Sequence, residues 1–272
     1  MINIPIYQVD AFADALFSGN PAAVCPLPHW LPEKVLKNIA AENNLSETAF
    51  IVTQQGEHEI RWFTPEDEVD LCGHATLAAA YVMFHYLGYE QQSIALNSRS
   101  GILNVSREGE YLALDFPALM PELCEAPEAL EIGLAIEPEQ VYKGYDYIVE
   151  YANETELRAV EPNLEAFCHL DGRGVVLTAP ADEYAEYDFV SRAFFPKLKV
   201  PEDPVTGSAH CELAPLWASV LGKQELIGYQ ASARGGRVHC TVKDDRVTLK
   251  GQVVPYLKGE ILIPSQLLRD SE

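Results

Sequence analysis

One segment of the chain is apolar over the full length of a helix. Residues Ala75 to Leu87 contain no Asp, Glu, Lys or Arg, and a glycine stands near each end, at Gly73 and Gly88. An α-helix without a charged face is not stable on a protein surface, so other elements must surround it. We therefore expect a fold that wraps around a central helix.

The second half of the chain repeats this plan. Gly207 and Gly222 are separated by the same fifteen positions as Gly73 and Gly88, with an apolar helix expected over Ala209–Leu221. An aromatic residue and a proline precede each helix, and an arginine and a glycine follow each at a similar distance. Similarity in a fixed order indicates a duplicated unit. We expect two related halves whose central helices begin at one shared cleft.

Apolar and alternating runs predict the remaining elements. An amphipathic helix is expected over Leu31–Asn43, and the proline-rich segment Pro117–Pro127 is expected as a linker. The predicted domains are therefore residues 1–118, with the strand region 258–272 crossing back to them, and residues 119–257. The strands are expected at 4–9, 23–24, 46–52, 59–63, 102–105, 111–116, 142–147, 157–160, 174–178, 189–194, 238–242, 247–250 and 260–263.

The charge balance limits the partners. The chain has 41 acidic and 19 basic residues, a formal net charge of −22. Nucleic-acid binding needs clustered Lys and Arg, so it is not expected. A protein with few cations can still bind an anion through backbone amides, because the first amides of a helix have no partner within it and carry partial positive charge.

Other functional classes lack their signals. The N-terminus shows neither the basic region nor the apolar core of a secretory signal, and no run approaches the roughly 18 apolar residues of a membrane helix. The 6 cysteines and 7 histidines form no CxxC or HExxH pattern. We expect a cytoplasmic protein with reduced thiols, no membrane segment and no metal site.

Several residues near the two helix N-termini have both a structural and a functional interpretation. His74 is either a buried structural group or a neutral hydrogen-bonding partner of a substrate, because a helix N-terminus disfavours its charged form. Asp203 is either a turn residue before Pro204 or an acid beside the ligand. Ser208 is expected as an N-cap whose hydroxyl could also reach a ligand. Cys72 is a packed thiol or a relic of an older site.

Four motifs carry a family resemblance. They are SGNPAAV (18–24), NLSETAF (44–50), DLCGHAT (70–76) and EDPVTGSAH (202–210). In this order and over nearly the whole chain they resemble the PhzF-type phenazine-biosynthesis isomerases, within the diaminopimelate-epimerase-like superfamily. The resemblance implies an α+β fold of two pseudo-symmetric domains, each a curved β-sheet rolled around a central helix. It also implies a homodimer, no cofactor and an active site between the domains.

The resemblance also implies roles for single residues. Glu47 matches the catalytic acid/base, and His74, Asp203 and Ser208 match residues around the substrate. The substrate-binding set is completed by the two glycines at the helix N-termini, an asparagine that shapes a loop near the cleft and a serine from the second motif: Gly73, Gly207, Asn20 and Ser46. The implied activity is a cofactor-independent isomerase that moves a proton between carbons of a small carboxylated substrate, cyclic or amino-acid-like.

Two alternatives stay open. The epimerase branch of the superfamily uses two thiols; here Cys72 stands where the first belongs but Asp203 stands where the second should be. An epimerase or racemase would have to pair Cys72 with Glu47. The other alternative is a small-molecule binding protein without catalysis that kept the fold.

The strand pattern alone does not decide the environment of Glu47. Its side chain shares one face of the expected strand with Ala49 and Ile51, because side chains alternate between the two faces. This apolar surrounding would desolvate the carboxyl group and favour its neutral form. Such a group can take up and return a proton. The opposite face also carries apolar residues, Phe50 and Val52, so the strand pattern also fits a solvated glutamate at the strand end.

Overall fold

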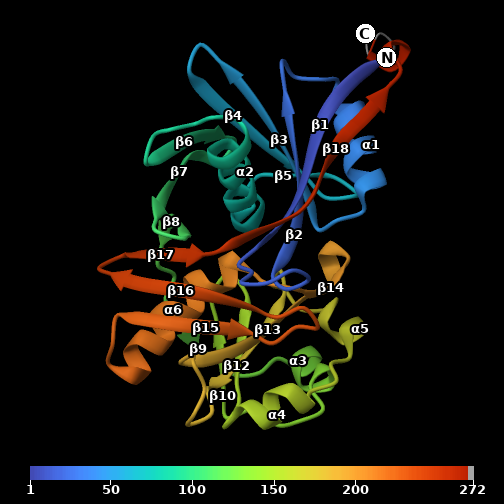
Figure 1. Ribbon diagram of the computed structural model, residues 1–272. Helices are drawn as coiled ribbons and strands as arrows, with labels where there is room; N and C mark the ends of the chain where they lie inside the picture. Colours follow the sequence, from blue (N-terminus) through green and yellow to red (C-terminus); the bar gives the residue numbers. More distant parts are fainter. Residues whose placement is uncertain (269–272) are drawn as a thin grey trace. The chain divides into compact units, whose positions relative to one another are not determined.

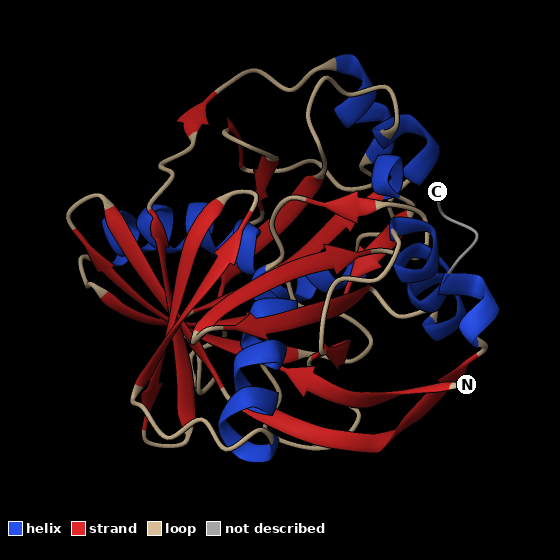
Figure 2. Ribbon diagram, turned by 90° about the horizontal axis from the view of Figure 1, so that it is seen from above, coloured by secondary structure: helices blue, strands red, loops and turns tan. Residues whose placement is uncertain are grey.

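The computed structural model describes residues 1–268 and divides the chain into two compact units. The first unit comprises Met1–Asp115 and the chain from Gly251 onward, and the second comprises Phe116–Lys250. Strands make up most of the regular structure and helices are few, as Figure 2 shows in red and blue. The expected fold class, helices combined with strongly curved sheet, is confirmed.

The first unit is built on a mixed sheet. Its strands pair in the order β18-β1-β2-β3-β4-β6-β7-β8, and the short β5 pairs with β4. The elements are β1 (Ile2–Ala11), β2 (Asn20–Leu27), α1 (Glu33–Asn43), β3 (Glu47–Gln54), β4 (Glu57–Phe63), β5 (Glu68–Val69), α2 (Gly73–Tyr86), β6 (Ser93–Ser98), β7 (Gly101–Glu108), β8 (Tyr111–Pro117) and β18 (Val253–Ile263).

The second unit has its own mixed sheet. Its strands pair in the order β9-β10-β11-β12-β13-β15-β16-β17, and the short β14 pairs with β13. The elements are β9 (Glu122–Leu123), α3 (Glu128–Gly133), β10 (Gln140–Lys143), β11 (Tyr147–Glu150), α4 (Glu154–Ala159), α5 (Leu164–Phe167), β12 (Val175–Pro180), β13 (Phe189–Phe195), β14 (Val200–Asp203), α6 (Gly207–Leu221), β15 (Glu225–Gln230), β16 (Gly236–Lys243) and β17 (Arg246–Gly251).

The two sheets follow the same pairing pattern. Read along each order, successive pairs are antiparallel, antiparallel, parallel, antiparallel, parallel, antiparallel and antiparallel. In each unit the central helix follows the short extra strand, β5 before α2 and β14 before α6. The internal duplication inferred from the glycine spacing is thus visible in the topology. Strand β3 of the first unit corresponds to β12 of the second.

The central helix of each unit is buried where the sequence lacks charges. Strands of the first unit surround α2 (Figure 1), which contacts β1, β2, β3, β7 and β18. Helix α6 contacts β15 and β16 of its own unit. A glycine with positive φ follows each helix, Gly88 at +71° and Gly222 at +66°. Residues with side chains rarely adopt this backbone conformation, so both glycines end their helices at low cost.

Helix α6 continues through an interior proline. Pro215 lacks an N–H group, so it cannot donate to the carbonyl oxygen of Cys211 one turn earlier. The backbone N–H of Leu119 donates to this oxygen instead, at 2.9 Å. The carbonyl group freed by the proline therefore keeps a partner inside the buried part of the second unit.

Two expected strands are wrong. Residues 142–147 do not form one strand, because they cover the end of β10, a bend at 144–146 and the first residue of β11. Residues 157–160 were predicted as a strand from their apolar character, but Glu154–Ala159 forms helix α4. The side chain of Asn153 accepts a hydrogen bond from the N–H of Glu156 at 2.9 Å and caps this helix. The cap, not the short apolar run, decides the local structure.

The C-terminal part of the chain belongs to the first unit. Strand β18 pairs antiparallel with β1 along its length, from Ile2 opposite Ile263 to Ala11 opposite Val253. Residues 269–272 of the expected crossing segment lie outside the described residues. Among residues 1–268, none of the helices has the length and apolar character needed to cross a membrane.

Candidate active site

Packing of strand β3 decides the environment of Glu47. Phe50 and Val52 lie in one apolar cluster with Leu36 of α1, so α1 covers that face of the strand. Glu47 and Ala49 lie on the opposite face, and β3 also contacts α2. The side chain of Glu47 is only 17% exposed. A glutamate solvated at the strand end is therefore not what the fold contains.

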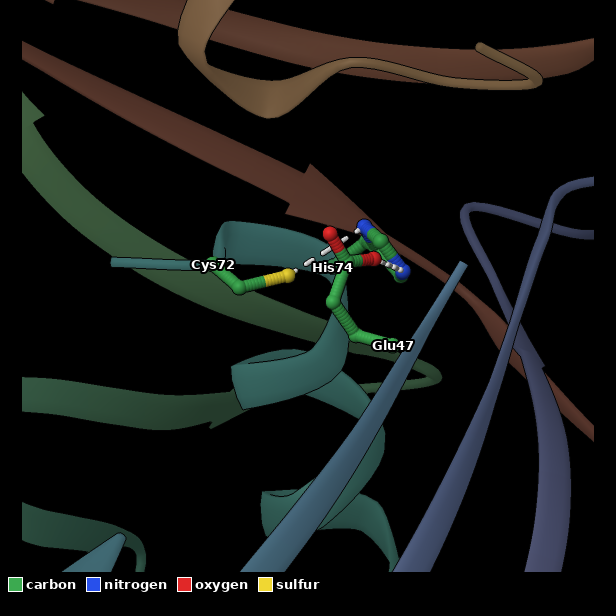
Figure 3. A group of neighbouring side chains, drawn as sticks. All are labelled: Glu47, Cys72 and His74. Atoms are coloured by element: carbon green, nitrogen blue, oxygen red, sulfur yellow. Dashed lines mark hydrogen bonds and ion pairs between the residues drawn. The ribbon is translucent and has the colours of Figure 1, made fainter. Parts of the chain in front are cut away.

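Glu47 faces the histidine in the first turn of α2. Oε2 of Glu47 lies 3.1 Å from Nε2 of His74, and Figure 3 shows the carboxylate beside the imidazole ring. Both atoms are buried, and within residues 1–268 neither has a hydrogen-bond partner other than this contact. Nδ1 of His74 lies 3.5 Å from Sγ of Cys72. The three side chains form one buried cluster.

Electrostatics within the cluster set the protonation of His74. Burial lowers the pKa of the ring, but the sulfur of Cys72 and the carboxylate of Glu47 raise it by more, so the pKa lies well above its ordinary value. The sequence favoured a neutral imidazole from the helix N-terminus alone. The contact with Glu47 was not visible in the sequence, and it favours an imidazolium paired with a carboxylate.

Cys72 is not prepared to act as a base. Burial and the negative charge of Glu47 raise the pKa of its thiol, although His74 opposes the shift. The ligand atoms of Glu47, Cys72 and His74 lie within 4.8 Å of one another, so the cluster could hold a metal ion. A metal would have to remove the thiol proton and break the contact between Glu47 and His74, because thiolate and neutral imidazole are the forms that bind.

The other predicted residues of the first unit lie around this cluster. Gly73 begins α2, and no side chain caps the helix N-terminus. Asn20 is fully buried at the start of β2; because Ala22 pairs with Glu47 in parallel register, Asn20 lies on the same face as Glu47. Ser46 is half-buried in the bend directly before β3.

At the N-terminus of α6, Asp203 is held by a turn. Its Oδ2 accepts a hydrogen bond from the hydroxyl of Thr206 at 2.5 Å. Gln230 of β15 accepts from the backbone N–H of Thr206 at 2.8 Å and donates to the backbone oxygen of Asp203 at 2.8 Å. Thr206, not Ser208, is the N-cap residue, and its side chain makes no cap hydrogen bond. The turn and ligand interpretations of Asp203 both remain compatible with this geometry.

Ser208 has a partner that the sequence did not indicate. Nη2 of Arg173 donates to Oγ of Ser208 at 2.9 Å. The same guanidinium binds Asp146 through two hydrogen bonds, Nε to Oδ1 at 3.1 Å and Nη2 to Oδ2 at 2.5 Å. Arg173 stands in a loop, where no periodicity marks a residue, so sequence reasoning had no signal for it.

Glu212 is a second residue that the sequence analysis missed. It is fully buried in α6, and its Oε1 accepts from the backbone N–H groups of Tyr145 at 2.6 Å and Asp146 at 3.3 Å. Burial and the charge of Asp146 raise its pKa from 4.5 to about 7, against the opposing effect of the amides and Arg173. A signal existed: Glu212 is the single charged residue in the sequence of α6.

Comparison with known proteins gives the family. The model of the phenazine biosynthesis-like proteins, PhzC-PhzF, matches residues 9–259. An uncharacterized isomerase of Pseudomonas aeruginosa is 49% identical over 260 residues, which cover 96% of this chain and 99% of that protein. A crystal structure of a PhzF-family phenazine biosynthesis protein from Enterococcus faecalis superposes with a TM-score of 0.92 at 46% identity, covering 96% of this chain and 100% of that one.

A more distant structure shares the fold alone. A hydroxyproline epimerase from Agrobacterium vitis, crystallised with trans-4-hydroxy-L-proline, has a TM-score of 0.60 at 10% identity, covering 99% of this chain and 98% of that one. The fold and the relatives define the chain as an enzyme of the isomerase class. It belongs to the PhzC-PhzF family of phenazine biosynthesis-like proteins.

Proposed function

We propose that the chain is a cofactor-independent isomerase in which Glu47 moves a proton between two carbons of a small carboxylated substrate. The observation that carries the proposal is the buried contact of 3.1 Å between Glu47 and His74. A carboxylate held out of bulk water beside an imidazolium has a fixed position, and its other oxygen, Oε1, lies outside this contact and can meet a C–H group.

The proposed step needs one acid/base group. The carboxylate of Glu47 removes a proton from the carbon next to the substrate carboxylate, and the electron pair spreads over the conjugated system. Glu47 then returns the proton to another carbon, so the double bond moves and no atoms are gained or lost. His74 holds the carboxylate in place, and its charge offsets the negative charge that develops.

Backbone amides are the proposed anion binders. The N-termini of α2 and α6, which begin at Gly73 and Gly207, have no side-chain cap. Such amides bind carboxylate groups and developing enolate charge. We assign the substrate carboxylate to them together with Ser208, and Asp203 to orientation of a polar group on the substrate. That the two helix N-termini serve one site stays a prediction, as do the homodimer and the cytoplasmic location.

The test is proton transfer on a simple probe. Cyclohexa-2,5-diene-1-carboxylate carries an acidic C–H between a carboxylate and two double bonds; its isomerisation gives the conjugated 1,5-diene, which ultraviolet absorbance and proton NMR detect. In D2O we expect deuterium at the carbon that receives the proton. Glu47→Gln keeps the shape but cannot accept a proton, so turnover should fall by about 10² to 10⁴. Near-normal turnover of Glu47→Gln would sink the mechanism.

The same experiment separates the alternatives. L-Proline and L-aspartate are offered in D2O beside the diene. Deuterium at Cα with inversion, lost in Cys72→Ala, would indicate an epimerase that pairs Cys72 with Glu47. Binding of the probes without exchange, unchanged in Glu47→Gln, would indicate a binding protein. The raised pKa of Cys72 counts against the first alternative.

A further inference from the structure

The duplicated topology places Arg173 close to the position that Glu47 has in the first unit. Glu47 begins β3, and Arg173 lies two residues before the corresponding strand, β12. Glu47 contacts His74, the second residue of α2, and Arg173 contacts Ser208, the second residue of α6. In each unit a side chain at or just before the start of the corresponding strand thus reaches the first turn of the central helix, a carboxylate in one unit and a guanidinium in the other.

Arg173 is held rigidly in this position. Asp146, which is fully buried, receives two of its hydrogen bonds. Its guanidinium carbon lies 4.7 Å from the ring centre of Tyr145 and 4.8 Å from that of Phe195. A planar guanidinium fixed by a two-point ion pair and two aromatic faces loses little further freedom when it makes a third contact.

The buried carboxyl group of Glu212 holds the loop that carries the partner of Arg173, Asp146. Glu212 binds the backbone N–H groups of Tyr145 and Asp146, the residues that contact the guanidinium. It lies one turn after Ser208 in α6. The loop that carries Asp146 is therefore tied to the same helix whose first turn Arg173 reaches. These contacts leave the direction of the Arg173 N–H bond toward Ser208 well defined.

The hydrogen bond from Arg173 determines what Ser208 can do. A hydroxyl group has one hydrogen and two lone pairs. One lone pair of Ser208 accepts from Arg173, and the hydroxyl makes no other hydrogen bond within residues 1–268. The hydroxyl hydrogen cannot point toward the guanidinium, which is itself a cationic donor. It is therefore available to donate to a different acceptor. Acceptance from a charged donor also polarises the hydroxyl and makes it a stronger donor.

We propose that Arg173 is a positioning residue that turns the hydroxyl of Ser208 into a fixed hydrogen-bond donor for a carboxylate at the N-terminus of α6. The assignment of that carboxylate to a substrate rests on the proposed function. The coupling between Arg173 and Ser208 does not, and it is tested first.

A cysteine at position 208 makes the effect of Arg173 measurable without any substrate, because its thiol pKa can be determined. In the Ser208→Cys variant the pH dependence of iodoacetamide alkylation, read on the tryptic peptide by mass spectrometry, gives the pKa of the new thiol. We expect a value below the ordinary value of about 8.5, because Arg173 and the helix N-terminus both favour a thiolate. Adding Arg173→Gln should raise it by about one unit. Adding Arg173→Lys, which keeps the positive charge but loses the two-point geometry of the guanidinium, should raise the thiol pKa by a smaller amount.

Arg61 provides the matched control. It also makes two hydrogen bonds to a nearly buried carboxylate, that of Glu68, at 2.7 and 2.6 Å, and it also lies over two rings, Trp30 and Phe63. Within residues 1–268 its hydrogen-bond and ion-pair partners are Glu68 and Glu33, and none is a serine. Arg61→Gln in the Ser208→Cys background should leave the thiol pKa unchanged. An unchanged pKa with Arg173→Gln and Arg173→Lys, in variants that fold by circular dichroism, would overturn the proposal.

The kinetic arm uses the diene carboxylate. Arg173→Gln should lower kcat/KM as much as Ser208→Ala does, roughly tenfold to a hundredfold, and the double variant should be no worse than Ser208→Ala alone. Effects that multiply in the double variant would overturn the positioning role. If Glu47→Gln keeps full turnover the proposed function fails, whereas the thiol titration still decides whether Arg173 sets the behaviour of position 208.

Discussion

The absence of a side chain at Gly144 makes room for the carboxylate of Glu212. A Cβ atom at position 144 would lie 2.2 Å from Oε1 of Glu212. This oxygen accepts from the two backbone N–H groups that follow, those of Tyr145 and Asp146. The glycine therefore permits a loop to close over a buried acid, and two predictions concern this relationship.

Gly144→Ala should destabilise the protein by roughly 2 kcal/mol or more, because the new methyl group pushes Oε1 of Glu212 away from its two amide donors. Urea unfolding measures the loss. Gly259→Ala in β18 is the control, since a Cβ there meets only ordinary contacts at 3.8 Å. In a Glu212→Ala background the cost of Gly144→Ala should largely disappear. An equal cost in both backgrounds would show that the clash is not with Glu212.

Glu212 should make stability fall as pH rises. Its pKa is raised from 4.5 to about 7 in the folded chain, so the folded state binds the proton more tightly than the unfolded state does. Stability is lost between these two values and is constant above them. Relative to the wild type, Glu212→Gln should gain up to roughly 3 kcal/mol as pH rises from about 5 to 8.

Urea unfolding across this range checks the Glu212 prediction. The comparison stays above the sequence pI of 4.6 to avoid precipitation. Glu225→Gln, at an exposed glutamate of β15, is the matched control and should follow the wild type throughout. A difference between Glu212→Gln and the wild type that is the same at all pH values would show that Glu212 does not change protonation on folding.

The charge of His74 should depend on Glu47. Burial lowers the pKa of His74, and Cys72 and Glu47 raise it well above 6.5 overall. Glu47→Gln removes a negative charge that opposes the effect of burial, so the pKa of His74 should fall. Proton NMR titration of the ring C–H resonances measures it, with His85 at the other end of α2 as the internal control. A His74 resonance that titrates at the same pH in both proteins would contradict the ion pair.

Cys72 should be a slow thiol that the reaction does not need. It is buried with a raised pKa, whereas Cys168 is exposed. Iodoacetamide should therefore label Cys168 long before Cys72. Cys72→Ala should keep turnover of the diene carboxylate within about threefold, while loss of an essential acid or base would cost about 10² to 10⁴. A loss of that larger size would restore the thiol to the mechanism.

The sequence predicted the central helices and their N-termini because long uncharged segments between glycines have few structural solutions. It did not decide the face of β3 on which Glu47 lies, since both faces are apolar. Packing of α1 determines this face, because Leu36 of α1 lies in one apolar cluster with Phe50 and Val52. Periodicity within one strand cannot reveal which neighbour covers which face.

The polar network of the second unit was largely beyond prediction. The role of Arg173 depends on its hydrogen bonds to Asp146 and Ser208, which are distant in sequence. A loop residue has no periodic pattern from which such partners could be predicted. Glu212 is different. A lone carboxylate in a helix that must be buried requires a partner or a shifted pKa, and this argument was available from the sequence of α6.

Pro215 also affects how the second unit comes apart. The N–H of Leu119 donates to the oxygen of Cys211, which an unbroken helix would have used itself. The segment that follows β8 can therefore acquire this bond only after α6 has formed around its proline. We expect the amide proton of Leu119 to exchange with solvent only when α6 opens. Leu119 lies outside regular secondary structure, yet its amide should exchange as slowly as the amides in the core of α6.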